Sequence, residues 1–271
     1  MTTYWRRLQE IGSERGSLCV GIDPHPSLLA AWGLPCDASG LERLSRDLVA
    51  ALGDVVAVFK PQSAFFEAYG SAGVAVLERV LADIAGTGAL SILDAKRGDI
   101  GSTMEAYADA YLADGSPLAA DAVTVSPYLG FGSLAPALER PHQYARGVYV
   151  LARTSYQVRA QVQLALTDDN SVVQAIIDAA TEANHFSRQR AIGLVVGGTH
   201  ASLGCDVSNF NGSILVPGIG FQGGRMSDLP AIFGDAVDQV LPVVGRGVLS
   251  AGPDPSALRG KVAELLEAAI A

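Results

Sequence analysis

Charged side chains of both signs gather around one apolar run of the sequence. Asp94, Lys96 and Asp99 follow the run Ala89–Leu93, and Lys60 follows the apolar run before it. Side chains alternate along a strand, so Asp94 and Lys96 are expected on the same side. A lysine between carboxylates stays protonated, because opposite charge favours its charged form. Confined in a site, this array suits proton delivery and stabilisation of developing charge. The alternative is an ordinary salt bridge at a rim.

Two glycine-rich segments near the C-terminus suggest an anion site. Residues 217–224 read Pro-Gly-Ile-Gly-Phe-Gln-Gly-Gly, and residues 245–247 read Gly-Arg-Gly. Glycine-rich turns expose backbone N–H groups, and an arginine adds a fork of donors. Either segment taken singly is equally well explained as a tight turn. Together, after the last two predicted strands of a barrel, they predict a phosphate site.

The elements that must position these residues are short, continuous apolar runs, as expected for parallel strands covered by helices. Amphipathic stretches with helical spacing lie between them. Eight strands alternating with helices predict an α/β fold, the (β/α)8 or TIM barrel. The predicted strands are Leu18–Ile22, Val55–Phe59, Ala89–Leu93, Ala122–Val125, Val148–Leu151, Ile192–Val196, Ser213–Val216 and Gln239–Val244. The clearest predicted helices are Leu41–Leu52, Val74–Ile84, Thr103–Leu112, Val172–Ala183 and Ala257–Ala269.

The alternative architecture is a doubly wound open sheet. That fold would carry a nucleotide fingerprint after its first strand, but residues 21–26 read Gly-Ile-Asp-Pro-His-Pro and do not match GxGxxG. No repeat or linker divides the sequence, so we expect one domain over residues 1–271. Residues 126–146 and 155–170 are rich in Pro, Gly, Ser and Gln, and are expected to be long connections on the catalytic face.

Composition narrows the class of protein. The chain has 271 residues, of which 49% are hydrophobic, and a net charge of −9. An acidic surface repels nucleic acid and anionic lipid, so neither is an expected partner. The N-terminal residues lack an apolar signal segment, and no run of 18 apolar residues predicts a membrane span.

The cysteines and histidines favour neither disulfides nor a metal site. Cys19, Cys36 and Cys205 are odd in number and widely spaced, which suits a reducing cytoplasm. The four histidines are scattered and form no HxH or HxxxH pair, so no metal is expected.

The segment 94–103, Asp-Ala-Lys-Arg-Gly-Asp-Ile-Gly-Ser-Thr, resembles the signature D-x-K-x-x-D-I-[GP]-x-T of orotidine 5′-monophosphate decarboxylases. The resemblance covers most of the chain. It includes residues 21–24, 59–62 and 64–67, the last two as in the longer bacterial branch, and the phosphate loops at 217–224 and 245–246. It implies conversion of orotidine 5′-monophosphate to uridine 5′-monophosphate and CO2, the last step of de novo UMP synthesis, with no cofactor.

The resemblance also implies roles in the charged array. Lys96 donates a proton to C6 of the pyrimidine, and Asp94 lies beside the departing carboxylate. Lys60 completes the array and contacts the ribose, as does Asp23. The ammonium of Lys96 stabilises the C6 carbanion electrostatically before protonating it.

The remaining implied roles concern a second subunit and the two ends of the nucleotide. Asp99 and Thr103 reach the ribose in the neighbouring subunit's site, so a homodimer with shared active sites is expected. Ser155 contacts the pyrimidine, with Thr154 as the alternative. The phosphate is held by Gln222, Gly245 and Arg246, with the register around Gln222 open by one or two places.

Three rival functions are weaker. A hexulose-phosphate synthase or keto-gulonate-phosphate decarboxylase resembles the same barrel but needs Mg²⁺ and a glutamate after strand two, where Lys60 would repel a metal. A Schiff-base aldolase needs a neutral lysine, but two aspartates favour the charged form of Lys96. A catalytically silent phosphate-ligand sensor does not need the intact set of Asp94, Lys96 and Asp99.

Overall fold

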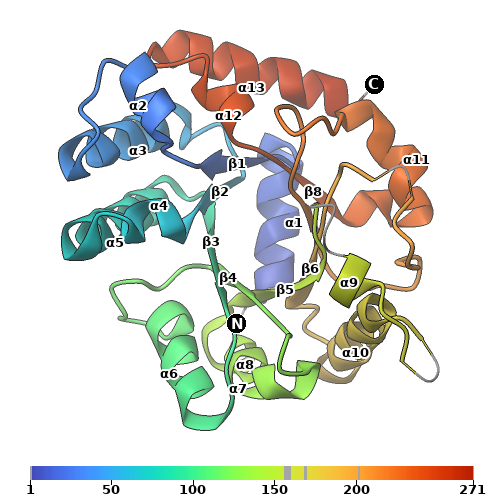
Figure 1. Cartoon of the computed structure of the whole chain (residues 1–271). Helices are drawn as coiled ribbons and strands as arrows, with labels where there is room; N and C mark the ends of the chain where they lie inside the picture. The colour runs from blue at the N-terminus through green and yellow to red at the C-terminus, as the bar shows by residue number, and fades with distance from the viewer. Residues whose placement is uncertain (1, 156–159, 168–169, 201, 271) are drawn as a thin grey trace.

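Eight parallel strands form a closed barrel in the computed structural model, which describes residues 2–155, 160–167, 170–200 and 202–270. Neighbours in sequence are neighbours in the barrel, and β8 pairs with β1. This confirms the predicted (β/α)8 architecture (Figure 1). The strands are β1 (Cys19–Ile22), β2 (Val58–Pro61), β3 (Leu90–Arg97), β4 (Ala122–Val125), β5 (Gly147–Arg153), β6 (Ile192–Val196), β7 (Ile214–Val216) and β8 (Val240–Val244).

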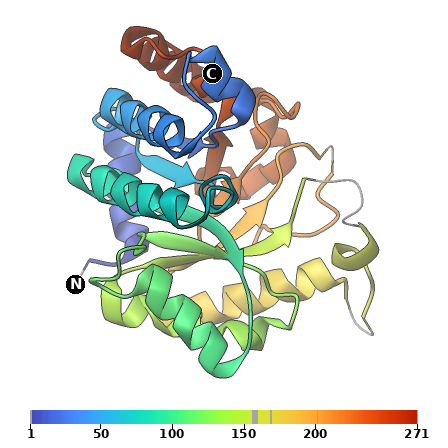
Figure 2. The same cartoon turned by 60° about the vertical axis from the view of Figure 1, so that its left-hand side comes forward.

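Helices surround the barrel, as both views show (Figures 1 and 2). The five predicted helices all lie within observed ones. Their buried faces pack on the outside of the strands, which is why their apolar residues recur at helical spacing. In chain order after β1 the helices and 3-10 turns are α2 (Pro26–Ala31), α3 (Ala38–Leu52), α4 (Ser63–Glu67), α5 (Gly70–Thr87), α6 (Gly101–Leu112), η1 (Phe131–Leu134), α7 (Ala135–Glu139), α8 (Pro141–Tyr144), α9 (Ala160–Gln163), α10 (Val172–Ser187), η3 (Met226–Asp228), α11 (Leu229–Phe233), η4 (Gly234–Gln239), α12 (Arg246–Leu249) and α13 (Pro255–Ile270).

Two connections differ from the sequence prediction. Residues 126–146 are not a loop, because they contain η1, α7 and α8 and supply the helical cover between β4 and β5. Prolines that suggested a loop lie in the first turns of α7 and α8, where a missing N–H costs nothing. Between β6 and β7, the described residues 197–200 and 202–213 form no helix, so the strand–helix alternation is not fully regular.

The N-terminal end of the barrel is closed by α1 (Tyr4–Arg15), a helix that the sequence analysis did not anticipate. Its residues Tyr4, Leu8 and Ile11 pack among the inward-facing residues of the strands. The Tyr4 hydroxyl lies 3.1 Å from that of Tyr149, inside the barrel. Figure 1 shows α1 lying across the ring of strands. With this end closed, the interior opens at the C-terminal ends of the strands.

Inward-facing positions change from apolar to polar along the strands. The lower interior is an apolar cluster that includes Val58 and Ile92. Two residues further along their strands, the same inward face presents Lys60 and Asp94, which line the cavity described below. Strand alternation therefore places charge at the open end of the barrel, where active sites of this fold lie. None of the described helices is long and apolar enough to cross a lipid bilayer.

Candidate active site

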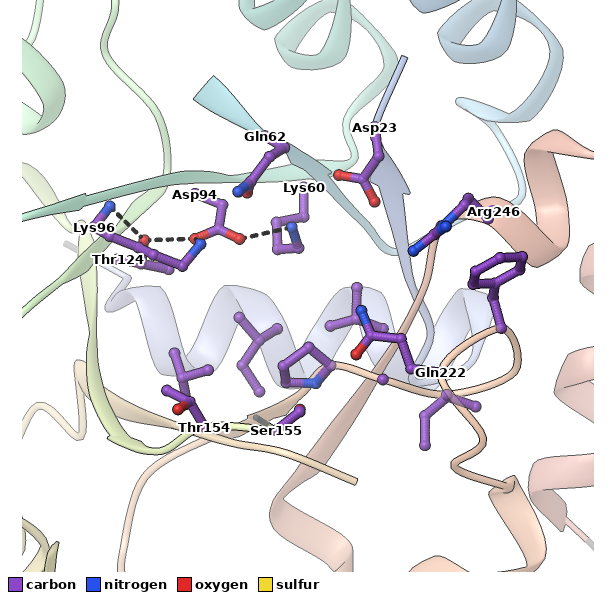
Figure 3. Close-up of a pocket in the computed structure, with 18 of the residues that line it drawn as sticks. Asp23, Lys60, Gln62, Asp94, Lys96, Thr124, Thr154, Ser155, Gln222 and Arg246 are labelled. Carbon is purple, nitrogen blue, oxygen red and sulfur yellow. Dashed lines mark hydrogen bonds and ion pairs between the residues drawn. The ribbon is translucent and has the colours of Figure 1, made fainter. Parts of the chain in front are cut away.

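A cavity of about 410 Å³ lies at the C-terminal ends of the strands. Eight of the residues singled out in the sequence line it, and Figure 3 shows most of them around one space. They are Asp23, Lys60, Asp94, Lys96, Ser155, Gln222, Gly245 and Arg246. Thr154, the alternative to Ser155, also lines the cavity. Asp99 and Thr103, both described, are not among its lining residues.

Asp94 is the centre of the charged array. Its Oδ2 accepts from Lys60 Nζ at 2.9 Å, and its Oδ1 accepts from Lys96 Nζ at 2.6 Å. The side chains of Lys60 and Asp94 are 6% and 12% exposed, whereas that of Lys96 is 43% exposed. Lys96 is therefore the ammonium that faces the cavity, and Lys60 is the buried partner that holds Asp94 in place.

The two ion pairs keep the array charged. Burial of Asp94 would raise the pKa of its carboxyl group, but the charges of Lys60 and Lys96 outweigh this and hold the pKa well below its usual value. Burial would lower the pKa of Lys60, but Asp94 and Asp23 outweigh it and raise that pKa. Lys60, Asp94 and Lys96 therefore form an ion-paired row at the cavity, whereas Asp99, the second carboxylate that the sequence analysis expected beside Lys96, is not among the residues that line it.

The backbone that presents Lys96 is not a regular strand. The register between β3 and β4 shifts between Leu93 and Arg97, and Lys96 has a φ of 49°, in the left-handed region. A non-glycine residue is held there only when its surroundings impose it. Asp94 and Lys96 converge as predicted, but a local bulge contributes to this convergence in addition to simple alternation.

The β5 end contributes Thr154 and Ser155 to the cavity. The Thr154 hydroxyl accepts from Gln163 Nε2 at 2.9 Å, and the backbone N–H of Thr154 donates to Gln163 Oε1 at 3.1 Å. Within the described part of the chain, Ser155 Oγ makes no hydrogen bond, and only the backbone carbonyl of Ser155 accepts one, from Thr199 Oγ1. A Cβ at Gly197 would collide with Ser155, so the glycine lets β6 approach this serine closely. The geometry favours Ser155 as the side chain available to a ligand.

The opposite end of the cavity carries Arg246. Its guanidinium lies 3.6 Å from the centroid of the Phe221 ring, which is a cation–π contact. Gln222, next to Phe221, points into the cavity (Figure 3). A Cβ at Gly245, directly after β8, would collide with the Asp23 carboxylate, so a larger residue there would displace that side chain. Arg246 and Gln222 thus lie at one end of the cavity and Lys96 at the other (Figure 3).

The glycine-rich loop 217–224 uses part of its backbone internally. The N–H groups of Gly220, Gly223 and Gly224 donate to carbonyl groups within the loop. These three donors are therefore committed to shaping the loop, whereas the sequence analysis expected its N–H groups to face an anion. Gln222 and Arg246 add side-chain donors that line the cavity.

His25, Gln62, Thr124 and Phe221 are among the lining residues that were given no role from the sequence. Gln62, with its amide nitrogen toward Asp94, donates to Oδ2 at 2.5 Å and accepts from Lys96 Nζ at 3.3 Å. Burial, then the charge of Arg246, lowers the pKa of His25 against the opposing effect of Asp23. The sequence could have indicated Gln62, because it lies two residues beyond Lys60 and alternation places both on the same inward face. Thr124 had a similar signal, as the polar residue of an apolar strand.

Asp99 lies outside the cavity, at the start of α6. Its Oδ1 accepts from the Ile100 backbone N–H at 2.8 Å, and Thr103 is exposed one turn further along the helix. Three large apolar side chains are exposed on this α6 start and on the segment after β4, namely Ile100, Tyr128 and Leu129. The start of α6 therefore combines the polar groups of Asp99 and Thr103 with the exposed apolar side chain of Ile100.

Comparison with known proteins identifies similar chains over the full length. The sequence profile described as "Orotidine 5'-phosphate decarboxylase / HUMPS family" matches residues 16–260. A Salinispora tropica protein named orotidine 5′-phosphate decarboxylase is 52% identical over 268 residues, covering 98% of this chain and 96% of the relative. A Streptomyces coelicolor protein of the same name is 51% identical over 261 residues, covering 96% of this chain and 94% of the relative.

Solved structures agree with the sequence comparison. A crystal structure from Streptomyces avermitilis, provisionally assigned the same name, has a TM-score of 0.94 and 49% identity, covering 100% of this chain and 95% of that one. The structure of Leishmania donovani OMP decarboxylase has a TM-score of 0.77 and 29% identity, and the match covers the whole of both chains.

Proposed function

The chain belongs to the orotidine 5′-phosphate decarboxylase / HUMPS family, and we propose that its cavity converts orotidine 5′-monophosphate to uridine 5′-monophosphate and CO2, the last step of de novo UMP synthesis. The observation that carries this proposal is the row of Lys60, Asp94 and Lys96 at the open end of the barrel. The names of relatives about half identical to this chain support the same reaction.

Lys96 is the proton donor in this proposal. The bond between C6 and the carboxylate carbon breaks, CO2 leaves, and the electron pair stays on C6. The fixed ammonium of Lys96 stabilises this charge and then transfers one of its protons to C6. The amine regains a proton from solvent after product release. Its exposure to the cavity, in contrast to buried Lys60, supports the assignment.

The neighbours of Lys96 orient the base and sugar. Asp94 lies beside the substrate carboxylate, so its negative charge opposes one that disappears as CO2 leaves. Lys60 neutralises Asp94 and, with Asp23, contacts the ribose. Ser155 contacts the pyrimidine, since the hydroxyl of Thr154 is already bonded to Gln163.

The phosphate binds at the other end of the cavity, to Gln222, Gly245 and Arg246. A guanidinium binds phosphate oxygens through two parallel hydrogen bonds. Because this end is remote from C6, its binding energy can be used to order the loop 217–224 over the substrate and lower the barrier.

No metal or organic cofactor enters this mechanism. In the metal-dependent branch of this family, a glutamate after the second strand binds Mg²⁺; here Lys60 occupies that place and is ion-paired with Asp94. A buried ammonium repels a divalent cation, and Asp94 already has both oxygens engaged. The charge stabilisation that cofactors supply in other decarboxylases is assigned here to Lys96.

The working unit of the enzyme is a cytoplasmic homodimer with shared active sites. Asp99 and Thr103 lie outside the cavity of their own chain. Ile100, next to Asp99 in sequence, is exposed, and so are Tyr128 and Leu129 in the segment that follows β4. Burial of such apolar groups is the main stabilising contribution at subunit interfaces. In a C2 dimer, each site then takes Lys96 from one chain and Asp99 from the other.

The test is the ultraviolet absorbance change of orotidine 5′-monophosphate on adding the purified protein, before and after dialysis against EDTA. The proposal expects loss of substrate, stoichiometric uridine 5′-monophosphate and an unchanged rate after dialysis. No turnover would contradict the function. A rate lost with EDTA and restored by Mg²⁺ would favour the metal-dependent synthases instead.

A further inference from the structure

The hydroxyl group of Thr124, on β4, lies at the irregular point of β3. On β4, Val123 pairs with Leu93 and Val125 with Arg97, so Thr124 faces the three residues 94–96. Three residues opposite one leave backbone groups of β3 without their usual ladder partners. The Lys96 N–H is one of these, and it donates to Thr124 Oγ1 at 3.0 Å. The threonine side chain replaces a backbone acceptor at the bulge.

The same hydroxyl group donates a hydrogen bond to Asp94. Thr124 Oγ1 lies 2.8 Å from Asp94 Oδ1, and a carboxylate held in its ionised form can only accept. Lys96 Nζ donates to that same Oδ1 at 2.6 Å. The hydrogen bonds therefore form a closed ring that runs from the Lys96 N–H through Thr124 Oγ1 and Asp94 Oδ1 to the Lys96 ammonium. Figure 3 shows Lys96, Thr124 and Asp94 together.

We propose that Thr124 is a positioning residue for the decarboxylation, which fixes the left-handed backbone of Lys96 and the orientation of Asp94 so that the ammonium reaches C6. This inference rests on the proposed function. Thr124 is 1% exposed and is not assigned a substrate contact, so its effect passes through the two residues it bonds. Its hydroxyl is needed twice, once as acceptor and once as donor.

Removal of the hydroxyl has a specific consequence. In Thr124→Val the shape of the side chain is retained, but the Lys96 N–H loses its acceptor and Asp94 Oδ1 loses a donor. The left-handed conformation of Lys96 then lacks a restraint, and its ammonium is no longer held at one position. Misplacement of a reacting group by about 1 Å costs roughly a hundredfold in rate. The phosphate end, formed by other strands, is unaffected.

The experiment compares wild type, Thr124→Val and Thr124→Ser as full-length proteins, measuring kcat, KM and binding of uridine 5′-monophosphate. Serine keeps the hydroxyl and is the matched control. For valine we expect kcat to fall about ten- to a hundredfold, with KM and product binding within about threefold of wild type. For serine we expect kcat within about threefold. Selective loss of kcat separates positioning from general damage to the fold.

The inference is overturned if Thr124→Val turns over at the wild-type rate, or if Thr124→Ser loses as much kcat as the valine variant. If valine abolishes product binding, Thr124→Ala removes the hydroxyl without adding bulk, and the same comparison with serine applies. Absence of turnover in the wild-type protein would instead contradict the proposed function itself, so the two failures are distinguishable.

Discussion

Replacing Lys60 with methionine tests whether the buried ion pair is the structural basis of the site. Methionine retains much of the side-chain volume but removes the ammonium that donates to Asp94 Oδ2 at 2.9 Å. Asp94 is then left 12% exposed with one of its two lysine partners gone. Leaving a buried charge without its partner destabilises a protein by about 3–5 kcal/mol. Because Asp94 keeps Lys96 and Thr124, the expected loss lies at the lower end, about 3 kcal/mol.

This loss has a measurable size. The unfolding entropy of a chain of this length makes about 3 kcal/mol equivalent to roughly 5 °C in Tm. Asp94→Asn should also destabilise, because it leaves the Lys60 ammonium buried beside a neutral amide. The double variant Lys60→Met/Asp94→Asn should be more stable than the sum of the two losses by at least about 1 kcal/mol, since it leaves no unpaired charge.

The pH dependence follows from the directions of the two pKa shifts. The lowered pKa of Asp94 means that its contribution is present above about pH 4, its unfolded value, and is lost as pH falls through the folded pKa. The raised pKa of Lys60 means that its contribution is present below about pH 10 and is lost as pH rises through the folded pKa. The Tm difference between wild type and Lys60→Met should be level from about pH 5 to 9 and narrow in acid.

Calorimetry of the four proteins at several pH values provides the assay. A Tm shift below about 1 °C for Lys60→Met, or losses of the two single variants that add within about 0.5 kcal/mol, would refute the argument. Either result would mean that Lys60 and Asp94 are not energetically coupled in the folded protein.

Three further predictions concern the substrate. Arg246→Ala should raise KM for the nucleotide about ten- to a hundredfold and lower kcat, while turnover of phosphate-free orotidine is unchanged; Arg225→Ala, outside the cavity, is the control. Phe221→Ala removes a 68%-exposed ring from Arg246 and should raise the nucleotide KM about two- to fivefold. Mixing the inactive variants Lys96→Ala and Asp99→Ala should restore about a quarter of wild-type activity after subunit exchange, and no recovery would mean that Asp99 serves its own chain or has no catalytic role.

Much of the site was predictable because it depends on patterns within short stretches of sequence. The period of a strand and the convergence of parallel strand ends predict that Lys60, Asp94 and Lys96 lie together, and the three side chains are in contact in the structure. The glycine-rich segments predicted a phosphate site, and Gln222 and Arg246 from these segments line the same cavity as Lys96. Each of these features is encoded within a few consecutive residues.

The features that the sequence analysis missed depend on contacts between residues that are distant in sequence. The bulge at Lys96 arises from the pairing of β3 with Thr124, 28 residues away, and no local pattern specifies it. Helix α1 is stabilised by contacts such as that of Tyr4 with Tyr149, 145 residues apart. The prolines of residues 126–146 are common in loops and in first helical turns alike, so tertiary position decides between the two.

The most direct test of the central claim is the turnover number of Lys96→Ala with orotidine 5′-monophosphate, measured on protein whose binding of uridine 5′-monophosphate is verified. If Lys96 delivers the proton to C6, kcat falls by several orders of magnitude, because the lost interaction belongs to the transition state, while the product still binds at the phosphate end. Near-normal turnover in a variant that binds the product normally would contradict the assignment of Lys96 as the proton donor.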